Sequence, residues 1–321
     1  MITVLAGGVG AARFLQGLLA VHPFSDVTIV SNVGDDCEFF GLHVSPDIDI
    51  VLYHLAGLAN EEQGFGLRGD TYNTLDALSR FGYDTWFRLG DLDLATCITR
   101  THLLRRGLTL SQATAEIARA LGVPVTVRPV TDDALRTKVR LDSGLLDFQE
   151  WMVHRRAAGP VREVIFEGAE WARPAPGVLE AIAGSRAVLL TPSNPFVSIA
   201  PILAVPGVRD ALRETEAKVV AVSPIVGGAA IKGPAAEMLR DQGLEVSPTA
   251  VARLYADFLD AIVIDEVDAR LAADIQVLET PAGRQRLAVT VTDTIMGSME
   301  KKTALARAVL QAAGLAAGRQ P

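Results

Sequence analysis

The sequence predicts an α/β protein with a doubly wound, Rossmann-like parallel sheet and a smaller inserted α+β subdomain. An apolar run at 2–6 is followed by glycines, a helical pattern and a second apolar run at 27–32, an order that predicts a parallel βαβ unit. Runs that are apolar throughout are typical of strands buried on both faces, and they recur at 187–194, 218–224 and 261–265. Residues 123–170 alternate between apolar and polar positions, which predicts the inserted subdomain.

The length and composition set the domain organisation. The chain has 321 residues, of which 49% are apolar, so it can bury a large core. This length indicates one large domain or a domain that carries a subdomain. We assign residues 1–122 and 179–321 to a nucleotide-binding core and residues 123–178 to the inserted subdomain.

Charge and cysteine content exclude several classes of protein. The net charge is -8 and no basic block offsets it, so we expect no nucleic-acid partner. Cys37 and Cys97 belong to no CxxC pair, which gives no support to a zinc site or a disulfide framework. The first residues lack a signal-peptide pattern, and no apolar run reaches the roughly 18 residues that span a bilayer. We therefore expect a soluble, cytoplasmic protein without a membrane partner.

Several helices can be placed by their ends. The segment 110–122 has Ser111 as a candidate N-cap and Gly122 as a candidate stop, and a closing helix is predicted over 299–315. Asp70 or Thr71 could start a further helix.

The glycine-rich turn after the first strand is a candidate phosphate site. Gly7, Gly8 and Gly10 would let backbone amides approach an anion at a helix N-terminus, and Arg13 could reach the same anion. The dinucleotide fingerprint is incomplete because Arg13 stands where its third glycine would fall, and no Walker A lysine follows. The alternative is a tight turn that simply needs glycine.

Two later loops follow buried strands and would lie at the carboxyl edge of the sheet. Ligands of open α/β sheets bind there, so Ser193 and Asn194 in one loop and Ser223 and Gly228 in the other are candidate nucleotide contacts. The alternative for each loop is a connection stiffened by proline.

A group of carboxylates follows the second strand. Asp35 and Asp36, and then Asp47 and Asp49, should lie near the glycine turn. Acidic groups beside a phosphate repel it unless a cation lies between them, and Mg²⁺ commonly uses one or two carboxylates together with substrate phosphates. The alternative is helix capping by Asp47 or Asp49 and solvated charge for the others.

The assembled motifs resemble the 2-phospho-L-lactate transferase family, which acts in deazaflavin coenzyme F-420 biosynthesis. The resemblance runs nearly end to end and rests on GGVGAARFLQGL, NVGDD, SPDIDIVLY, GDTYNT, RLGD, FQEW, SNPFVSIAPIL and SPIVGGAAIKGPA. It implies a doubly wound core, a homodimer and a requirement for Mg²⁺. It also implies transfer of a phosphoenolpyruvyl or 2-phospholactyl unit from a guanosine diphosphate donor to the ribityl hydroxyl of 7,8-didemethyl-8-hydroxy-5-deazariboflavin, with release of GMP.

Site residues follow from the motifs that match. The resemblance implies deazaflavin contacts at Asp49 and Arg88 and metal ligands at Asp35, Asp36 and Asp49, and we add Asn73 and Arg100 to the acceptor site. Leu92 and Cys97 stand where the family usually has Arg and His. Asp49 is our candidate catalytic residue, which would orient the attacking hydroxyl or accept its proton.

Two other functions compete with this hypothesis. Proteins with a similar glycine-rich opening bind nucleotide sugars and act as non-catalytic metabolic regulators. The acceptor-side motifs GDTYNT, RLGD and FQEW favour the transferase. A nicotinamide oxidoreductase ranks third, because the third glycine is absent.

Overall fold

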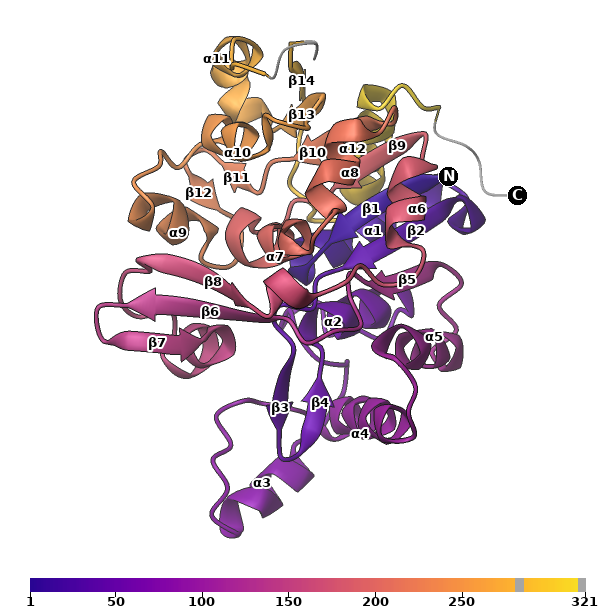
Figure 1. The fold of residues 1–321 in the computed structure, drawn as a ribbon, viewed down its shortest axis with the longest axis vertical. Coiled ribbons are helices and arrows are strands. Elements are labelled where there is room, and N and C mark those ends of the chain that lie inside the picture. Colours follow the sequence, from indigo (N-terminus) through magenta and orange to yellow (C-terminus); the bar gives the residue numbers. More distant parts are fainter. Residues whose placement is uncertain (281–285, 317–321) are drawn as a thin grey trace.

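A computed structural model describes residues 1–280 and 286–316, and its centre is a seven-stranded parallel sheet (Figure 1). The strand order is β14-β13-β10-β9-β1-β2-β5. The bounds are β1 Ile2–Ala6, β2 Val27–Ser31, β5 Thr126–Pro129, β9 Ala187–Leu190, β10 Lys218–Val222, β13 Ala261–Ile264 and β14 Ala288–Val291. The predicted α/β class and parallel sheet are confirmed.

The strand order reverses between β1 and β9. The chain runs outward from β1 through β2 to β5, then returns to β9 on the other side of β1 and continues outward to β14. The loops that leave β1 and β9 therefore diverge and leave a crevice at the carboxyl edge, which is where doubly wound proteins bind ligands.

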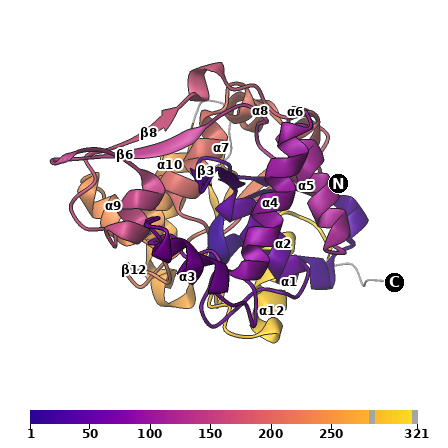
Figure 2. The same ribbon diagram turned by 90° about the horizontal axis from the view of Figure 1, so that it is seen from below.

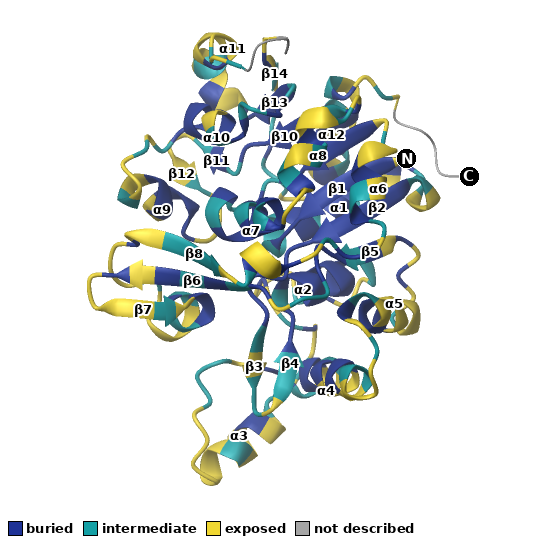
Figure 3. Cartoon of the chain, in the orientation of Figure 1, coloured by how far each residue is buried: buried dark blue, intermediate teal, exposed yellow. Residues whose placement is uncertain are grey.

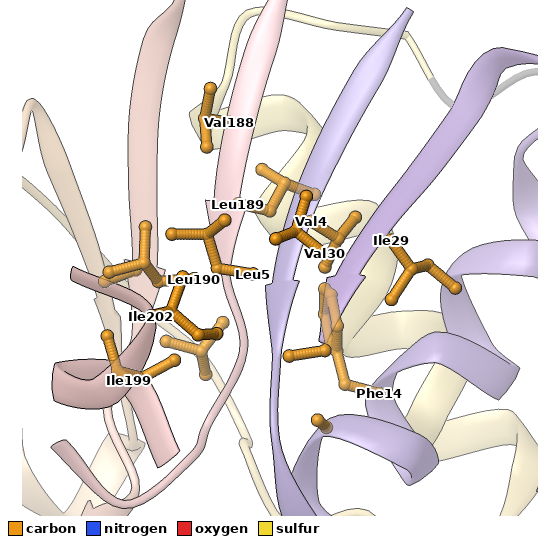
Figure 4. Close-up of a cluster of buried hydrophobic side chains, with 14 of the residues drawn as sticks. Val4, Leu5, Phe14, Ile29, Val30, Val188, Leu189, Leu190, Ile199 and Ile202 are labelled. Atoms are coloured by element: carbon orange, nitrogen blue, oxygen red, sulfur yellow. The ribbon is translucent and has the colours of Figure 1, made fainter. Parts of the chain in front are cut away.

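The core lies between this sheet and the helices on its two faces. Strands β1, β2, β9 and β13 are buried at every position. Figure 4 shows Leu5, Phe14, Leu189 and Ile202 among the side chains that fill the interior. Burial of each such side chain stabilises the fold by about 1.5–3 kcal/mol.

Helices cover both faces of the sheet (Figures 1 and 2). The first face carries α1 (Gly8–Val21), α2 (Pro46–Leu55) and α12 (Met299–Ala312), and α1 packs against each of the other two. The second face carries α6 (Val178–Ala183), α7 (Ala200–Ala204) and α8 (Val208–Glu214). Further helices are α4 (Asp91–Arg105), α5 (Leu110–Ala120), α9 (Ala235–Asp241), α10 (Pro248–Tyr255) and α11 (Ala272–Gln276). The predicted closing helix is α12.

A second, antiparallel sheet lies beside the first. It consists of β6 (Arg136–Leu141), β7 (Gly144–Asp147) and β8 (Glu163–Glu167), and a short π-helical segment, η2 (Glu150–His154), follows β7. The main sheet reaches farther along the chain than the expected division at 123, because β5 pairs with β2. Residues 126–129 alternate in burial because β5 is an edge strand, not because they leave the core.

A β-hairpin carries part of the chain away from the main sheet. Strands β3 (Cys37–Phe39) and β4 (Leu42–Val44) lead toward α3 (Asn73–Arg80) and α4, and Figure 3 shows that α3 is largely exposed. The two helices cap each other: Asp70 accepts hydrogen bonds from the Leu92 and Asp93 amides, and Asp91 accepts from the Asn73 and Thr74 amides. Asp70 therefore caps a helix that begins about twenty residues later, whereas Tyr72 occupies the N-cap of α3.

The expected N-cap of the helix at 110–122 is wrong by two residues. Helix α5 begins at Leu110, and Thr109 caps it in a capping box with Gln112. The hydroxyl of Ser111, already inside the first turn, makes no cap. Gly122 follows the helix end with a φ of 70°, as a C-terminal stop requires.

Among the described residues, no single helix has the length and apolar composition to cross a membrane. One pair, Pro195–Ala204 and Val208–Glu214, meets that test only when both helices are counted together, and it is bent by 86°.

Candidate functional site

Two adjoining cavities open at the carboxyl edge of the main sheet. We call the first the aromatic cavity; its volume is about 320 Å³ and its walls include Tyr53, Phe65, Trp86, Phe87, Arg88 and Asp93. We call the second the cationic cavity; its volume is about 420 Å³ and its walls include Gly7, Gly10, Arg13, Ser193, Asn194 and Lys232. Gly8, Asp47, Phe65 and Gln149 line both, so the two cavities meet at these residues.

The glycine turn is fixed by close backbone approach. A Cβ on Gly7 would lie 2.6 Å from Asp47 Oδ2, and a Cβ on Gly10 would lie 2.3 Å from the Pro192 carbonyl oxygen. Gly8 has a φ of 76°, which favours glycine. The Ser193 hydroxyl donates to the Gly7 carbonyl at 2.7 Å and so links the loops after β9 and β1. The N-terminus of α1 therefore opens into the cationic cavity.

Two carboxylates face this cavity and share one amide. Asn32, directly after β2, donates to Asp47 Oδ2 at 2.9 Å and to Asp35 Oδ1 at 3.3 Å. Burial raises the pKa of Asp47 to about 6, against hydrogen bonds from Asn32 and the Gly8 amide. Burial, with the nearby Asp47, also raises the pKa of Asp35 well above its usual range. A cation bound between these oxygens would favour their ionised forms.

Two cations lie across the same cavity. Burial lowers the pKa of Lys232, and the positive charge of Arg13 lowers it further. Neither side chain forms an ion pair with a carboxylate anywhere in the part of the chain that the structure describes. Cations that repel each other and lack a countercharge bind an anion favourably, and phosphate oxygens are suitable ligands for both.

The floor of the aromatic cavity holds a second charged group. Asp49 accepts two hydrogen bonds from the Arg100 guanidinium, one of them 3.1 Å long from Nη1. Burial acts against the charge on Arg100, but Asp49 more than offsets it and raises the pKa of the guanidinium. Tyr53 donates to Asp93 Oδ1 at 2.7 Å, and burial, with Asp49 nearby, raises the pKa of Asp93 to about 7.

Metal-binding geometry occurs in one group of three among the described residues. One ligand atom each of Asp49, Asp93 and Cys97 lies within 4.8 Å of the others. Arg100 already binds both Asp49 oxygens, and burial raises the pKa of Cys97, which keeps its sulfur a thiol. This group therefore suits a metal less well than Asp35 and Asp47 do.

The three expected metal ligands do not share one cavity. Asp35 lines the cationic cavity and Asp49 lines the aromatic cavity. Asp36 lines neither; its Oδ2 accepts one hydrogen bond from the Ser45 hydroxyl and contacts His43 Nε2 at 2.9 Å. The structure instead brings Asp47, which directly follows Pro46 in the first turn of α2, next to Asp35.

The other expected contacts are distributed as follows. Arg88 lines the aromatic cavity and stacks over the Tyr72 ring at 4.1 Å. Asn73 lies outside both cavities, where its side chain binds Asp91. Arg100 is fully buried behind Asp49. The expected nucleotide contacts Gly7, Gly8, Gly10, Arg13, Ser193, Asn194 and Ser223 all line the cationic cavity.

Gly228 has a different position from the one expected. With Gly227 it forms the two-residue turn between β11 (Ile225–Val226) and β12 (Ala229–Ala230), where both glycines have positive φ. It does not line the cationic cavity. The glycine pair therefore serves the hairpin, which brings Ile231 and Lys232 to the cavity.

Several residues of the site escaped sequence reasoning. Lys232 and Gln149 line the cavities, and Asn32 joins the two carboxylates. Lys232 carried a signal, because it is a cation in a glycine-rich loop after a buried strand. Gln149 carried one as part of the FQEW motif, although the motif did not indicate its place in the cavities. Trp86 carried little, because its place depends on the segment packed against the hairpin.

The two departures from the family motif have unequal structural consequences. Leu92 is 52% exposed in the first turn of α4 and lines neither cavity. Cys97 is fully buried one turn below Asp93 and beside the Asp49–Arg100 pair. Only the cysteine changes the surroundings of a cavity residue.

Together, these features define an α/β protein with a two-part ligand site at its topological switch point. Comparison with known proteins identifies the family. The family model for "2-phospho-L-lactate transferase CofD" matches residues 2–304. The chain therefore belongs to the CofD family, as its motifs indicated, and family membership makes it a transferase of the phosphoenolpyruvate or 2-phospholactate type.

Relatives named phosphoenolpyruvate transferase and relatives named 2-phospho-L-lactate transferase are both similar to this protein over almost the whole chain. A phosphoenolpyruvate transferase of Streptomyces griseus is 42% identical over 318 residues, which cover 97% of this chain and 98% of the relative. A 2-phospho-L-lactate transferase of Methanocaldococcus jannaschii is 38% identical over 318 residues and 98% of each chain.

A solved structure has the same fold. It is a UPF0052 family protein of Bacillus halodurans, with a TM-score of 0.61 and 15% identity over 96% of this chain and 98% of that one. At this identity, the likeness concerns the fold alone.

Proposed function

We propose that this protein transfers a phosphoenolpyruvyl or 2-phospholactyl unit from a guanosine diphosphate donor to the ribityl hydroxyl of 7,8-didemethyl-8-hydroxy-5-deazariboflavin and releases GMP. The observation that carries the proposal is the meeting of an aromatic cavity and a cationic cavity at Asp47. A flat polyaromatic acceptor and a diphosphate donor need these two environments, with their reacting atoms at the junction.

The aromatic cavity suits the deazaflavin ring. Phe65, Trp86 and Phe87 provide apolar surface, and Arg88 and Asp93 provide polar groups for the ring edges. Polar groups of this kind fix the orientation of a flat ligand in an apolar pocket. The ribityl chain would then lead from the ring toward Asp47 and Gln149.

The cationic cavity suits the donor. The diphosphate would lie between Arg13 and Lys232, close to the N-terminus of α1. Ser223 and Ser193 line the same cavity; their hydroxyls donate to the Ile225 and Gly7 carbonyls, which leaves the hydroxyl oxygens as acceptors for N–H or O–H groups of the nucleoside.

Asp35 and Asp47 fit the Mg²⁺ that the family implies. Their carboxylates are buried, share one amide and face the cavity that holds both cations. Mg²⁺ binds one or two carboxylates and substrate phosphates, so it would supply charge neutralisation at the diphosphate when bound. We propose this pair as its protein ligands.

The chemical step is a displacement at phosphorus. The acceptor hydroxyl oxygen forms a bond to the phosphorus that carries the three-carbon unit, and the bond from this phosphorus to the bridging oxygen breaks. The bridging oxygen leaves with GMP and keeps the electron pair. Arg13 and Lys232 neutralise charge on the phosphate oxygens, and the hydroxyl proton passes to a carboxylate on the aromatic side of the junction. Arg100 holds Asp49 in one orientation, so Asp49 serves as a fixed acceptor for that proton or for the hydroxyl hydrogen bond.

The test combines purified protein, Mg²⁺, the deazaflavin and each guanosine donor in separate reactions. We expect GMP release and a product with the mass of the acceptor plus one phosphorylated three-carbon unit, from one donor or from both. Tight binding of a uridine diphosphate sugar, with no deazaflavin binding and no GMP, would favour the regulator instead. A homodimer in the cytoplasm stays a prediction, which sedimentation and cell fractionation would check.

A further inference from the structure

A third cavity adjoins the other two at Gln149. Its volume is about 360 Å³. It is bounded by the turn after β2 and by the second sheet, and its walls include Asp35, Asp36, Arg136, Thr137, Asp147 and Gln149. We call it the side cavity.

The three cavities converge on one side chain. Gln149 lines the aromatic, cationic and side cavities, and Asp35 lines both the cationic and the side cavity. Gln149 is 9% exposed and immediately precedes the π-helical segment η2, an irregularity that is frequent at functional sites. The reacting centre assigned to the junction is therefore adjacent to three spaces rather than two.

Most of the acidic side chains that line the side cavity already pair with a basic side chain. Three of its carboxylates have a basic side chain within 3.3 Å. The pairs are Asp36–His43, Asp147–Lys138 and Glu150–Arg155, with distances of 2.9, 3.3 and 2.7 Å. Glu38 is exposed to solvent. The wall is therefore less acidic than its composition indicates.

Arg136 is the exception to this pairing. Its guanidinium donates to the Leu135 carbonyl and makes no ion pair with a carboxylate within the described ranges 1–280 and 286–316. It lies close enough to Cys37, another wall residue, to act electrostatically on the thiol. Beside it, the buried Thr137 hydroxyl has no hydrogen-bond partner in the same described ranges, although buried hydroxyls normally have one.

Displacement at phosphorus gives these observations a chemical meaning. The attacking alcohol and the leaving nucleotide approach and depart roughly in line, and the ester substituent that stays on phosphorus projects to the side. In the proposed reaction, the alcohol approaches from the aromatic cavity and the nucleotide departs into the cationic cavity. The retained substituent of the proposed donors is a three-carbon acid, and its carboxylate needs a cation.

We propose that the side cavity binds the transferred three-carbon acid and that Arg136 binds its carboxylate. This inference rests on the proposed function, and it assigns a subsite and a specificity-determining residue to it. The ester bond between phosphorus and the three-carbon unit stays intact throughout. Arg136 takes no part in bond breaking; it holds the retained group aside so that the alcohol can approach in line.

Donor binding tests the proposal directly. The probes are enolpyruvyl-diphosphoguanosine and a methyl-diphosphoguanosine that lacks the carboxylate. Dissociation constants are measured calorimetrically, with Mg²⁺, for the wild type, Arg136→Ala and Arg136→Lys. Arg140→Ala is the matched control, because Arg140 lies on the same face of β6, is exposed and lines neither the aromatic, the cationic nor the side cavity.

We expect Arg136→Ala to weaken the carboxylate-bearing donor by about 10- to 100-fold, since a hydrogen-bonded charge pair is lost. The methyl analogue should bind all four proteins within about twofold, and Arg136→Lys should lie between wild type and Ala. GMP release at saturating donor should change much less than donor affinity. This split separates carboxylate binding from a general structural role.

The outcomes that overturn the proposal are distinct from those that overturn the function. Equal weakening of both probes by Arg136→Ala, or no weakening of either, would remove Arg136 from carboxylate binding while leaving the transferase intact. A wild type that binds neither guanosine probe and releases no GMP would overturn the proposed function, and the subsite with it.

Discussion

Four buried carboxyl groups surround the two main cavities, and their partners divide them into two kinds. Asp35 and Asp47 share the amide of Asn32, which leaves their charges open to a ligand. Asp49 is bound to Arg100, and Asp93 accepts from a tyrosine hydroxyl. The first kind suits a cation and the second suits fixed orientation of a substrate.

Asp93 makes stability depend on pH. Burial, with Asp49 nearby, raises its folded-state pKa to about 7, whereas in the unfolded chain it ionises near pH 4. Between these values the unfolded chain has lost the proton that the folded protein keeps, so the free energy of unfolding falls as pH rises. Asp93→Asn keeps an oxygen acceptor for Tyr53 and removes the ionisation. We expect the free energy of unfolding of the variant to exceed that of the wild type at pH 8 by on the order of a few kcal/mol, and by less at pH 5.

Urea unfolding in metal-free buffer at the two pH values measures this difference. Asp76→Asn, which changes an exposed carboxylate on α3, is the control and should show no such pH-dependent gain. A variant that is no more stable than wild type at pH 8 would contradict the account of Asp93.

Individual site residues can be predicted from the sequence where a local pattern of neighbouring residues indicates their position. The glycines before α1, Arg13 and Ser193 line the predicted site because each lies directly after a strand or in the following helix turn. Asp47 was expected near the glycine turn but was not included among the metal ligands. Its hydrogen-bond partner Asn32 lies at the end of another strand, so no local pattern connects the two. The pairing of Asp49 with Arg100 joins residues 51 positions apart and has no local signal.

At the scale of elements, the β1–α1 turn depends on close approach to the loop after β9. A Cβ on Gly10 would lie 2.3 Å from the Pro192 carbonyl oxygen, which is backbone and cannot rotate away. We expect Gly10→Ala to destabilise the protein by about 1–3 kcal/mol, because either loop must shift. It should also weaken donor binding, since α1 opens into the cationic cavity.

Equilibrium unfolding in urea measures the loss. Gly297→Ala is the control, because a Cβ there would meet no atom within 4 Å. An unchanged midpoint for Gly10→Ala would show that the turn is looser than the structure indicates.

Elements were predicted well where they are long or buried on both faces, as with β9, β10, β13 and α12. The N-cap of α5 was missed because Thr109 and Ser111 are both cap-forming residues, and only the capping box with Gln112 separates them. The reciprocal caps of α3 and α4 were not predicted, because each aspartate caps the other helix. Edge strand β5 was assigned to the insertion because half-buried strands alternate wherever they lie.

For the whole molecule, topology explains why the site forms where it does. The reversal between β1 and β9 opens the cationic cavity, and the β3–β4 hairpin with the segment before α4 adds the aromatic cavity beside it. The doubly wound class follows from strand patterns in the sequence. The shapes of the cavities do not, because they depend on how the hairpin and the second sheet lie against the core.

The central claim is that the acceptor and the donor occupy separate cavities that meet at Asp47. Steady-state kinetics of Lys232→Ala and Arg88→Ala, with each substrate varied in turn, tests it most directly. We predict a crossed pattern: Lys232→Ala raises the KM for the guanosine donor by about 10-fold and Arg88→Ala raises the KM for the deazaflavin by a similar factor, each with little effect on the other substrate. If both variants raised the KM of the same substrate, the division of the site into donor and acceptor cavities would be wrong.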